Sequence, residues 1–251
     1  MSNIVLSNQN SFYEFSIIYE IENIKKYNNK ITTLFVVNGI VELEIDNKKI
    51  KIFPDQGVLI SPQAKIQSIV LKDEAVIYEV IPEKKIEKLI EFVDEKNKIN
   101  EEEITNYKIL DNHKKVKKPW GYELWIVWLK DYHVLKKIFL KKDFKTSLQY
   151  HQKKFETNYI QIGKAKIINN FHLDNVNNPN TTGVDYDHLL KNYSKDVDAP
   201  FSFTVKPHEV HRIFSIEDCT SYEVSTPQLD DVIRLQDDAK RESGRIFSEH
   251  K

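Results

Sequence analysis

Apolar and polar residues alternate along short stretches in the first third of the chain. Residues 41–45 read VELEI and residues 50–53 read IKIF, each with a period of two. That period is typical of a half-buried β-strand. Turn-forming Asp, Asn, Pro and Gly occupy 46–49 and 54–57, and the apolar run 58–60 follows. Short strands with turns between them predict a sandwich or barrel for residues 11–81.

The pattern changes to a helical period and then back to strands. Apolar residues at 86, 89, 90 and 93 stand among Lys and Glu, which predicts an amphipathic helix linking two halves. Strand-like runs resume at 122–129, 133–140, 146–150, 159–168, 201–205 and 220–225. Two β-rich halves around a helix predict a tandem repeat of one fold. Residues 169–200 are rich in Asn, Asp and Thr and predict a long loop.

Composition narrows the classes of partner and location. The chain has 251 residues, with 37 Lys and Arg against 38 Asp and Glu, so no sign of charge dominates. We therefore expect neither a nucleic acid nor a membrane as partner. The single Cys219 cannot form an internal disulfide, which fits a reducing compartment. Residues 1–10 are polar and lack the apolar core of a signal peptide, so a cytoplasmic location is expected.

Four side chains in the second half have the character of metal ligands. Gln149 and His151 lie two apart on a predicted strand and so share a face. Glu156 follows, then Gly163, which supplies a tight hairpin, and His211 comes from a later strand. Imidazole, carboxylate and amide oxygen suit Zn, Fe, Mn, Co or Ni, and the set alone does not choose among them. The competing interpretation is a hydrogen-bonded polar cluster.

Three ordered motifs carry a resemblance to a known family. Residues 148–156 (LQYHQKKFE) are similar to the metal strand of the cupins, and within them of the type II phosphomannose isomerase group, also found fused behind mannose-1-phosphate guanylyltransferases. Residues 117–123 (KKPWGYE) resemble the opening Pro-Trp-Gly segment of that group, and residues 230–238 (DDVIRLQDD) its closing segment. The resemblance covers residues 115–241, which is about half of the chain.

The resemblance implies an all-β fold of two cupin barrels (jelly rolls, or double-stranded β-helices) in tandem, joined by a helical linker. We expect a degenerate N-terminal cupin at 1–82, a linker at 83–112, and a metal-binding cupin at 113–251 that contains the 169–200 loop. Residues 1–112 contain no His, so the first barrel should hold no transition metal. The second should hold one divalent ion per chain, zinc first among the five metals. By family likeness we also expect a homodimer.

The implied activity is a metal-dependent isomerase or epimerase of a sugar phosphate, in polysaccharide or nucleotide-sugar synthesis. Glu223 and Lys136 are candidates for moving the proton, because both are polar in otherwise apolar strands and match family positions. Their alternative role is a buried ion pair. Arg212 and Lys145 are candidates for a phosphate clamp, and for Arg212 the alternative is a salt bridge at a strand end.

Two other functions stay open on the sequence. One is different metal chemistry on the same scaffold, such as an Fe-dependent dioxygenase or a lyase acting on another small substrate. The other is a non-catalytic sugar-binding module. Metal analysis with oxygen uptake would separate the first from an isomerase, and ligand binding without turnover would favour the second.

Overall fold

The structure is a computed structural model that describes residues 4–21, 27, 29–86, 98–173, 185–244 and 246. It divides into two compact units. The first unit comprises Met1–His113 together with Ile126–His133. The second comprises Lys114–Trp125 together with Val134–Lys251. No helix in the described ranges has the length and apolar character needed to cross a bilayer.

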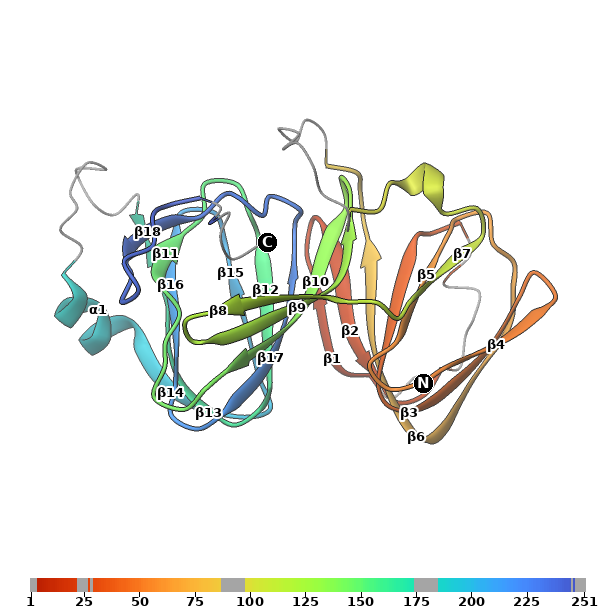
Figure 1. Ribbon diagram of the computed structural model, residues 1–251, viewed down its shortest axis with the longest axis horizontal. Coiled ribbons are helices and arrows are strands. Elements are labelled where there is room, and N and C mark those ends of the chain that lie inside the picture. The colour runs from red at the N-terminus through yellow and green to blue at the C-terminus, as the bar shows by residue number, and fades with distance from the viewer. Residues whose placement is uncertain are drawn as a thin grey trace. The chain divides into compact units, whose positions relative to one another are not determined.

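The first unit is built on one seven-stranded antiparallel sheet, coloured red to yellow in Figure 1. Its order is β1-β2-β6-β3-β5-β7, with β4 paired to β3. The buried aliphatic side chains of this unit form a core cluster that includes Leu34, Val36, Val58 and Ile77. The strands are β1 (Ile4–Gln9), β2 (Tyr13–Ile18), β3 (Thr32–Ile45), β4 (Lys48–Ile52), β5 (Gly57–Ile60), β6 (Ile66–Pro82) and β7 (Tyr107–Leu110).

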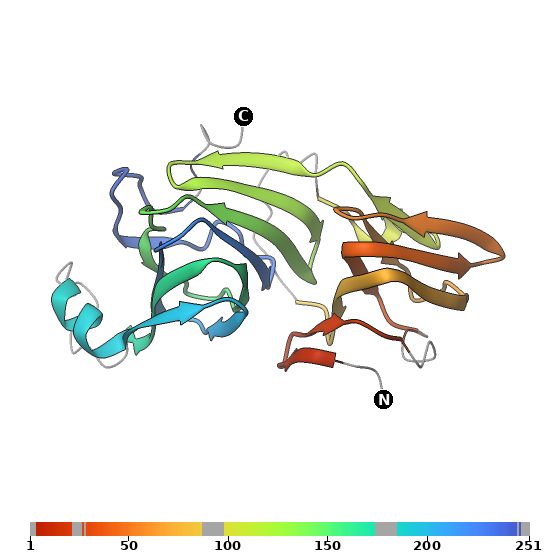
Figure 2. The same ribbon diagram turned by 90° about the horizontal axis from the view of Figure 1, so that it is seen from below.

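The second unit has a six-stranded sheet, β15-β12-β17-β10-β9-β8, and a five-stranded sheet, β14-β13-β16-β11-β18. The two sheets enclose an interior, as Figures 1 and 2 show. The strands are β8 (Lys114–Lys118), β9 (Gly121–Leu129), β10 (His133–Leu140), β11 (Leu148–Tyr150), β12 (Glu156–Ile162), β13 (Lys164–His172), β14 (Ser194–Asp198), β15 (Phe201–Val205), β16 (Glu209–Ser215), β17 (Cys219–Ser225) and β18 (Ile233–Gln236).

Two predicted segments need correction. Within the predicted linker, Tyr107–Leu110 is strand β7, paired with β5, because its apolar residues extend the first sheet. A 3-10 helix, η2, covers Glu101–Glu103. The predicted helix falls mostly on residues 87–97, which lie outside the described ranges.

Residues 169–200, predicted as a loop, contain the end of β13, helix α1 (Tyr186–Tyr193) and strand β14. Asp185 caps the helix by accepting hydrogen bonds from the backbone N–H groups of Asp187 and His188. The buried Leu189 packs into a cluster with Phe171 and Val210. Other apolar side chains of α1 pack against the same cluster, so an apolar face of the helix holds this polar segment on the barrel. Residues 174–184 of the predicted loop lie outside the described ranges.

Candidate metal centre

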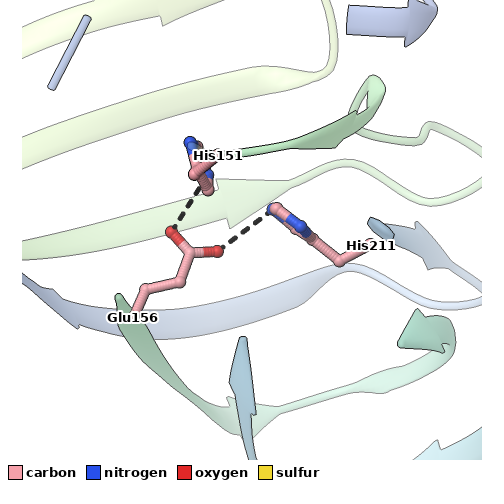
Figure 3. Close-up of side chains that lie close together, drawn as sticks. All are labelled: His151, Glu156 and His211. Carbon is pink, nitrogen blue, oxygen red and sulfur yellow. Dashed lines mark ion pairs between the residues drawn. The ribbon is translucent and has the colours of Figure 1, made fainter. Parts of the chain in front are cut away.

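Three of the four predicted metal ligands meet inside the second unit (Figure 3). Glu156 begins β12, His151 follows β11, and His211 lies on β16. Glu156 Oε1 is 3.1 Å from His211 Nε2, and Glu156 Oε2 is 3.6 Å from His151 Nε2. One ligand atom from each residue lies within 4.8 Å of the others, and all three side chains are buried. Paired sheet registers thus bring together groups that are far apart in sequence.

Both imidazoles are oriented by backbone carbonyls. His151 Nδ1 contacts the carbonyl oxygen of Asp231, and His211 Nδ1 lies 3.1 Å from that of Glu209. A carbonyl oxygen only accepts, so each Nδ1 carries a proton, and Nε2 is the atom of each ring that faces the other two groups of the triad. Metal-binding histidines are commonly oriented in this way.

The donor set fits a divalent ion. His151 Nε2 is buried and has no hydrogen-bond partner. Burial, followed by the nearby Lys154 ammonium, lowers the pKa of His151 to about 3, so this ring is neutral near pH 7. Burial alone would raise the pKa of Glu156, but Lys154 and His211 hold it well below its ordinary value. Two imidazole nitrogens and one carboxylate are the donors of many zinc sites.

Gln149 lies beside this triad, but its amide oxygen faces elsewhere. Gln149 is the register partner of His211 in the β11–β16 pair. Its Nε2 is 3.2 Å from His211 Nε2, while its Oε1 accepts a hydrogen bond of 2.6 Å from Ser147 Oγ. The amide would have to turn to offer oxygen to an ion. The role of Gln149 as a ligand therefore stays a prediction.

A row of alternating charges runs from the triad across the six-stranded sheet. Lys154 Nζ lies 2.6 Å from Glu156 Oε2 and 2.8 Å from Glu223 Oε1. Beyond Glu223, the successive nitrogen–oxygen distances are 3.6, 3.5 and 3.7 Å. We call this row the charge chain; its members, in order, are Glu156, Lys154, Glu223, Lys136, Glu123 and Lys118.

The charge chain brings together both residues predicted for proton transfer. Lys136 on β10 and Glu223 on β17 are register partners, and Asn158 on β12 pairs with Glu223 from the other side. Their catalytic role stays a prediction, because the same contacts also make a buried ion-pair network. Lys154 and Glu123 have no predicted role and are additions from the structure. Lys154 was missed because it lies in the turn before β12, where a period of two does not apply.

The triad and the charge chain line one cavity of about 100 Å³, which has room for a few water molecules or a small substrate. Trp120, Trp125 and Ile138 contribute apolar lining, and Asp230 and Arg234 also line the cavity. Burial raises the pKa of Asp230 to about 6. The cavity therefore joins metal ligands, ionisable groups and apolar walls.

Arg212 and Lys145 lie away from this cavity lining. Successive residues of a strand point to opposite faces, so Arg212 turns away when His211 turns inward. The Arg212 guanidinium donates to the carbonyl of Thr146 and to both the side chain and carbonyl of Gln236. Lys145 pairs with Asp238 at 3.1 Å. These contacts hold the chain around β18 to the barrel, and the structure gives no support for a phosphate clamp here.

Asp231 organises the turn that carries Lys154. Its carboxylate accepts hydrogen bonds from the backbone N–H groups of Gln152, Lys153 and Lys154, and its carbonyl accepts from His151. The closing motif, residues 230–238, thus supports the metal strand.

Comparison with known proteins finds structural neighbours and no sequence relatives. No family model and no curated protein matches the chain. A glyoxylate-induced protein from Pseudomonas aeruginosa, described as putative, superposes with a TM-score of 0.58 at 12% identity, covering 89% of this chain and 78% of that one. A mutant oxalate decarboxylase from Bacillus subtilis gives 0.58 at 9%, covering 90% and 71%. Salicylate 1,2-dioxygenase from Pseudoaminobacter salicylatoxidans, also a mutant, gives 0.51 at 7%, covering 87% and 72%.

Identities this low establish the fold alone. The matches extend over both halves of the chain. The predicted fold class is confirmed, whereas no match singles out the phosphomannose isomerase group. The chain has the bicupin fold, with a candidate His/Glu/His metal centre in its second barrel.

Proposed function

We propose that this protein is a metal-dependent isomerase or epimerase of a sugar phosphate. One observation carries the proposal: a metal-type triad and a row of buried acid and base groups share a single cavity. Isomerisation between neighbouring carbons needs both a Lewis acid and a group that moves a proton. The motifs at 117–123 and 148–156 support the isomerase class over other metal chemistry.

Each of these residues would have a separate role in the reaction. His151, Glu156 and His211 would hold the ion, which polarises a carbonyl and its neighbouring hydroxyl when bound. Glu223 would accept and return the proton, because it lies in the same cavity and is a carboxylate held by two lysines. Lys136 would keep Glu223 oriented, since the two are register partners. Trp120 and Trp125 would limit access of water.

The size of the cavity bears on how the substrate binds. A cavity volume of about 100 Å³ accommodates the reacting carbons beside the triad. The phosphate of the substrate would extend from the reacting carbons toward solvent. The predicted homodimer and cytoplasmic location stay predictions.

Proton exchange tests the proposed function. The zinc-loaded protein would be incubated in D₂O with a panel of hexose and heptose phosphates, and deuterium next to the carbonyl would be followed by NMR. We expect incorporation that is lost in Glu223→Gln and His211→Ala and kept in Lys145→Met, which lies outside the cavity. Absence of exchange with every sugar in a metal-loaded protein would refute the isomerase.

A second candidate is decarboxylation or oxidation of a small carboxylic acid. The cavity accommodates a small acid beside the triad, and one structural neighbour, oxalate decarboxylase of Bacillus subtilis, has Mn(II) centres. Loading the protein with Mn²⁺ or Fe²⁺ and measuring CO₂ release or O₂ uptake with small acids separates this candidate from the isomerase.

A further inference from the structure

The cavity is electrically balanced before any ion binds. Among its described lining residues, three lysines of the charge chain alternate with three glutamates. Arg234, Arg241 and Asp230 also line the cavity, and Arg241 pairs at 2.8 Å with Asp237, which lies outside the lining. The Nε2 atoms of His151 and His211 lie 3.6 and 3.1 Å from the carboxylate oxygens of Glu156. A divalent cation would therefore give this site a net positive charge, because the carboxylates around it already have positively charged neighbours.

Lys154 is the cause of this balance at the metal centre. Its ammonium nitrogen is 2.6 Å from Glu156 Oε2, closer than either imidazole nitrogen is to that carboxylate. Lys154 and Glu156 are both buried, so their charges are poorly screened by water. The one anionic ligand of the triad thus already contacts an internal cation, which it shares with Glu223 at 2.8 Å.

We infer that Lys154 makes the metal centre bind its ion together with a small anion: the ion lacks a free protein counter-charge, and a carboxylate or phosphate oxygen in the cavity supplies one. This inference rests on the proposed metal centre and names the class of its second ligand. A cavity of about 100 Å³ accepts an anion of a few heavy atoms beside the triad. The same property would favour a substrate that ionises or carries an acid group near the reacting carbons.

Two affinities test the inference. Zinc affinity would be measured by competition with a chromogenic chelator, and anion binding by the fluorescence of Trp120 and Trp125, which line the cavity. Malonate and inorganic phosphate serve as probes, with malonamide as the uncharged match for malonate. We expect the zinc-loaded protein to bind one of the anions about tenfold more tightly than the metal-free protein, with no such gain for malonamide. Zinc content is measured again after each titration.

The variant Lys154→Met should move the two affinities in opposite directions. Zinc should bind about tenfold more tightly, because Glu156 then offers its full charge, and the anion about tenfold more weakly. Lys118→Met is the matched control: it removes another buried ammonium of the charge chain, but one that contacts Glu123 and not the triad. It should leave zinc affinity within about twofold of the wild type.

The results can overturn the inference about the anion without overturning the proposed metal centre. A wild-type protein that binds zinc, but binds malonate and phosphate equally well with and without it, overturns the anion inference alone. So does a Lys154→Met variant in which both affinities shift together, or an equal gain in zinc affinity in Lys118→Met. Failure to bind zinc at all overturns the proposed metal centre as well. If Lys154→Met does not fold, the wild type still decides, because zinc affinity must rise with added anion by the factor that zinc raises anion affinity.

Discussion

At the scale of single residues, His133 illustrates how burial sets the charge of a side chain. The ring is fully buried in the first unit, with Nε2 3.0 Å from Thr33 Oγ1. Burial lowers its pKa from 6.5 to about 3. The unfolded chain therefore takes up the proton first as pH falls, and the folded state loses stability between these two values.

We predict a pH-dependent free energy of unfolding from this residue. Between pH 6.5 and 3, His133 should contribute a loss of about 1.4 kcal/mol per pH unit at most. Urea unfolding of the metal-free protein at several pH values would measure the slope, and His133→Gln should flatten it. His188→Gln, at an exposed position, is the control and should leave the slope unchanged. Equal slopes in all three proteins would contradict the assignment.

Asp231 is a second residue with a measurable local role. Its carboxylate accepts three backbone N–H groups from the turn that follows His151. Asp231→Ala should lower the free energy of unfolding by about 1–3 kcal/mol and weaken zinc binding, because three backbone donors lose a charged acceptor and the turn loosens. Asp238→Ala, which removes an exposed ion pair with Lys145, should cost less than about 1 kcal/mol. Chelator competition and chemical unfolding measure both effects.

The residue scale also shows what the sequence could and could not predict at the site. His151, Glu156 and His211 were predictable, because ligand type and spacing on strands determine which face they share. The same rule places Arg212, which directly follows His211, on the opposite face of β16. Lys154 was not predictable, since a turn residue has no fixed face. Its position depends on hydrogen bonds to Asp231, which lies far along the chain.

At the scale of elements, alternating patterns predicted the strands better than the segments between them. β3, β4, β5, β9, β10, β12, β13, β15 and β17 fall on stretches whose side-chain pattern is strand-like. The sequence did not predict β7, because it lies in a charged segment with a weak strand pattern. Pairing with β5 stabilises this strand. α1 was hidden among polar residues, since only Leu189 of the helix is buried.

The turn between β12 and β13 provides a prediction at this scale. Gly163 has a φ of +95°, and an added Cβ would lie 2.3 Å from the carbonyl oxygen of Asp218. Gly163→Ala should therefore destabilise the protein by more than about 2 kcal/mol, because both the backbone conformation and the space are unsuitable. Gly244→Ala is the control: its φ is +77°, but the nearest atom to an added Cβ is 3.8 Å away. Thermal unfolding should show a clearly smaller loss for Gly244→Ala, and comparable losses would contradict a steric cause.

At the scale of the whole molecule, the two units do not follow one cut in the sequence. The predicted boundary near residue 113 places 126–133 with the metal-binding barrel, whereas Ile126–His133 group with the first unit. The backbone explains this grouping. Ile99 N–H donates to the carbonyl of Trp128, and Lys130 N–H donates to that of Ile99. A pattern of apolar residues identifies these strands but does not specify which unit they join.

Because Ile126–His133 belong to the first unit, we can predict how fragments of the chain behave. A fragment of residues 1–113 lacks Ile126–His133, so Ile99 loses its backbone partners and buried apolar side chains lose their cover. We expect it to aggregate or to show no cooperative unfolding by circular dichroism. The same fragment joined through a short flexible linker to residues 126–133 should recover solubility and a cooperative transition, because the first unit is then complete. Equal behaviour of the two fragments would mean that 126–133 contributes nothing essential, and the unit would have to be redrawn to end at residue 113.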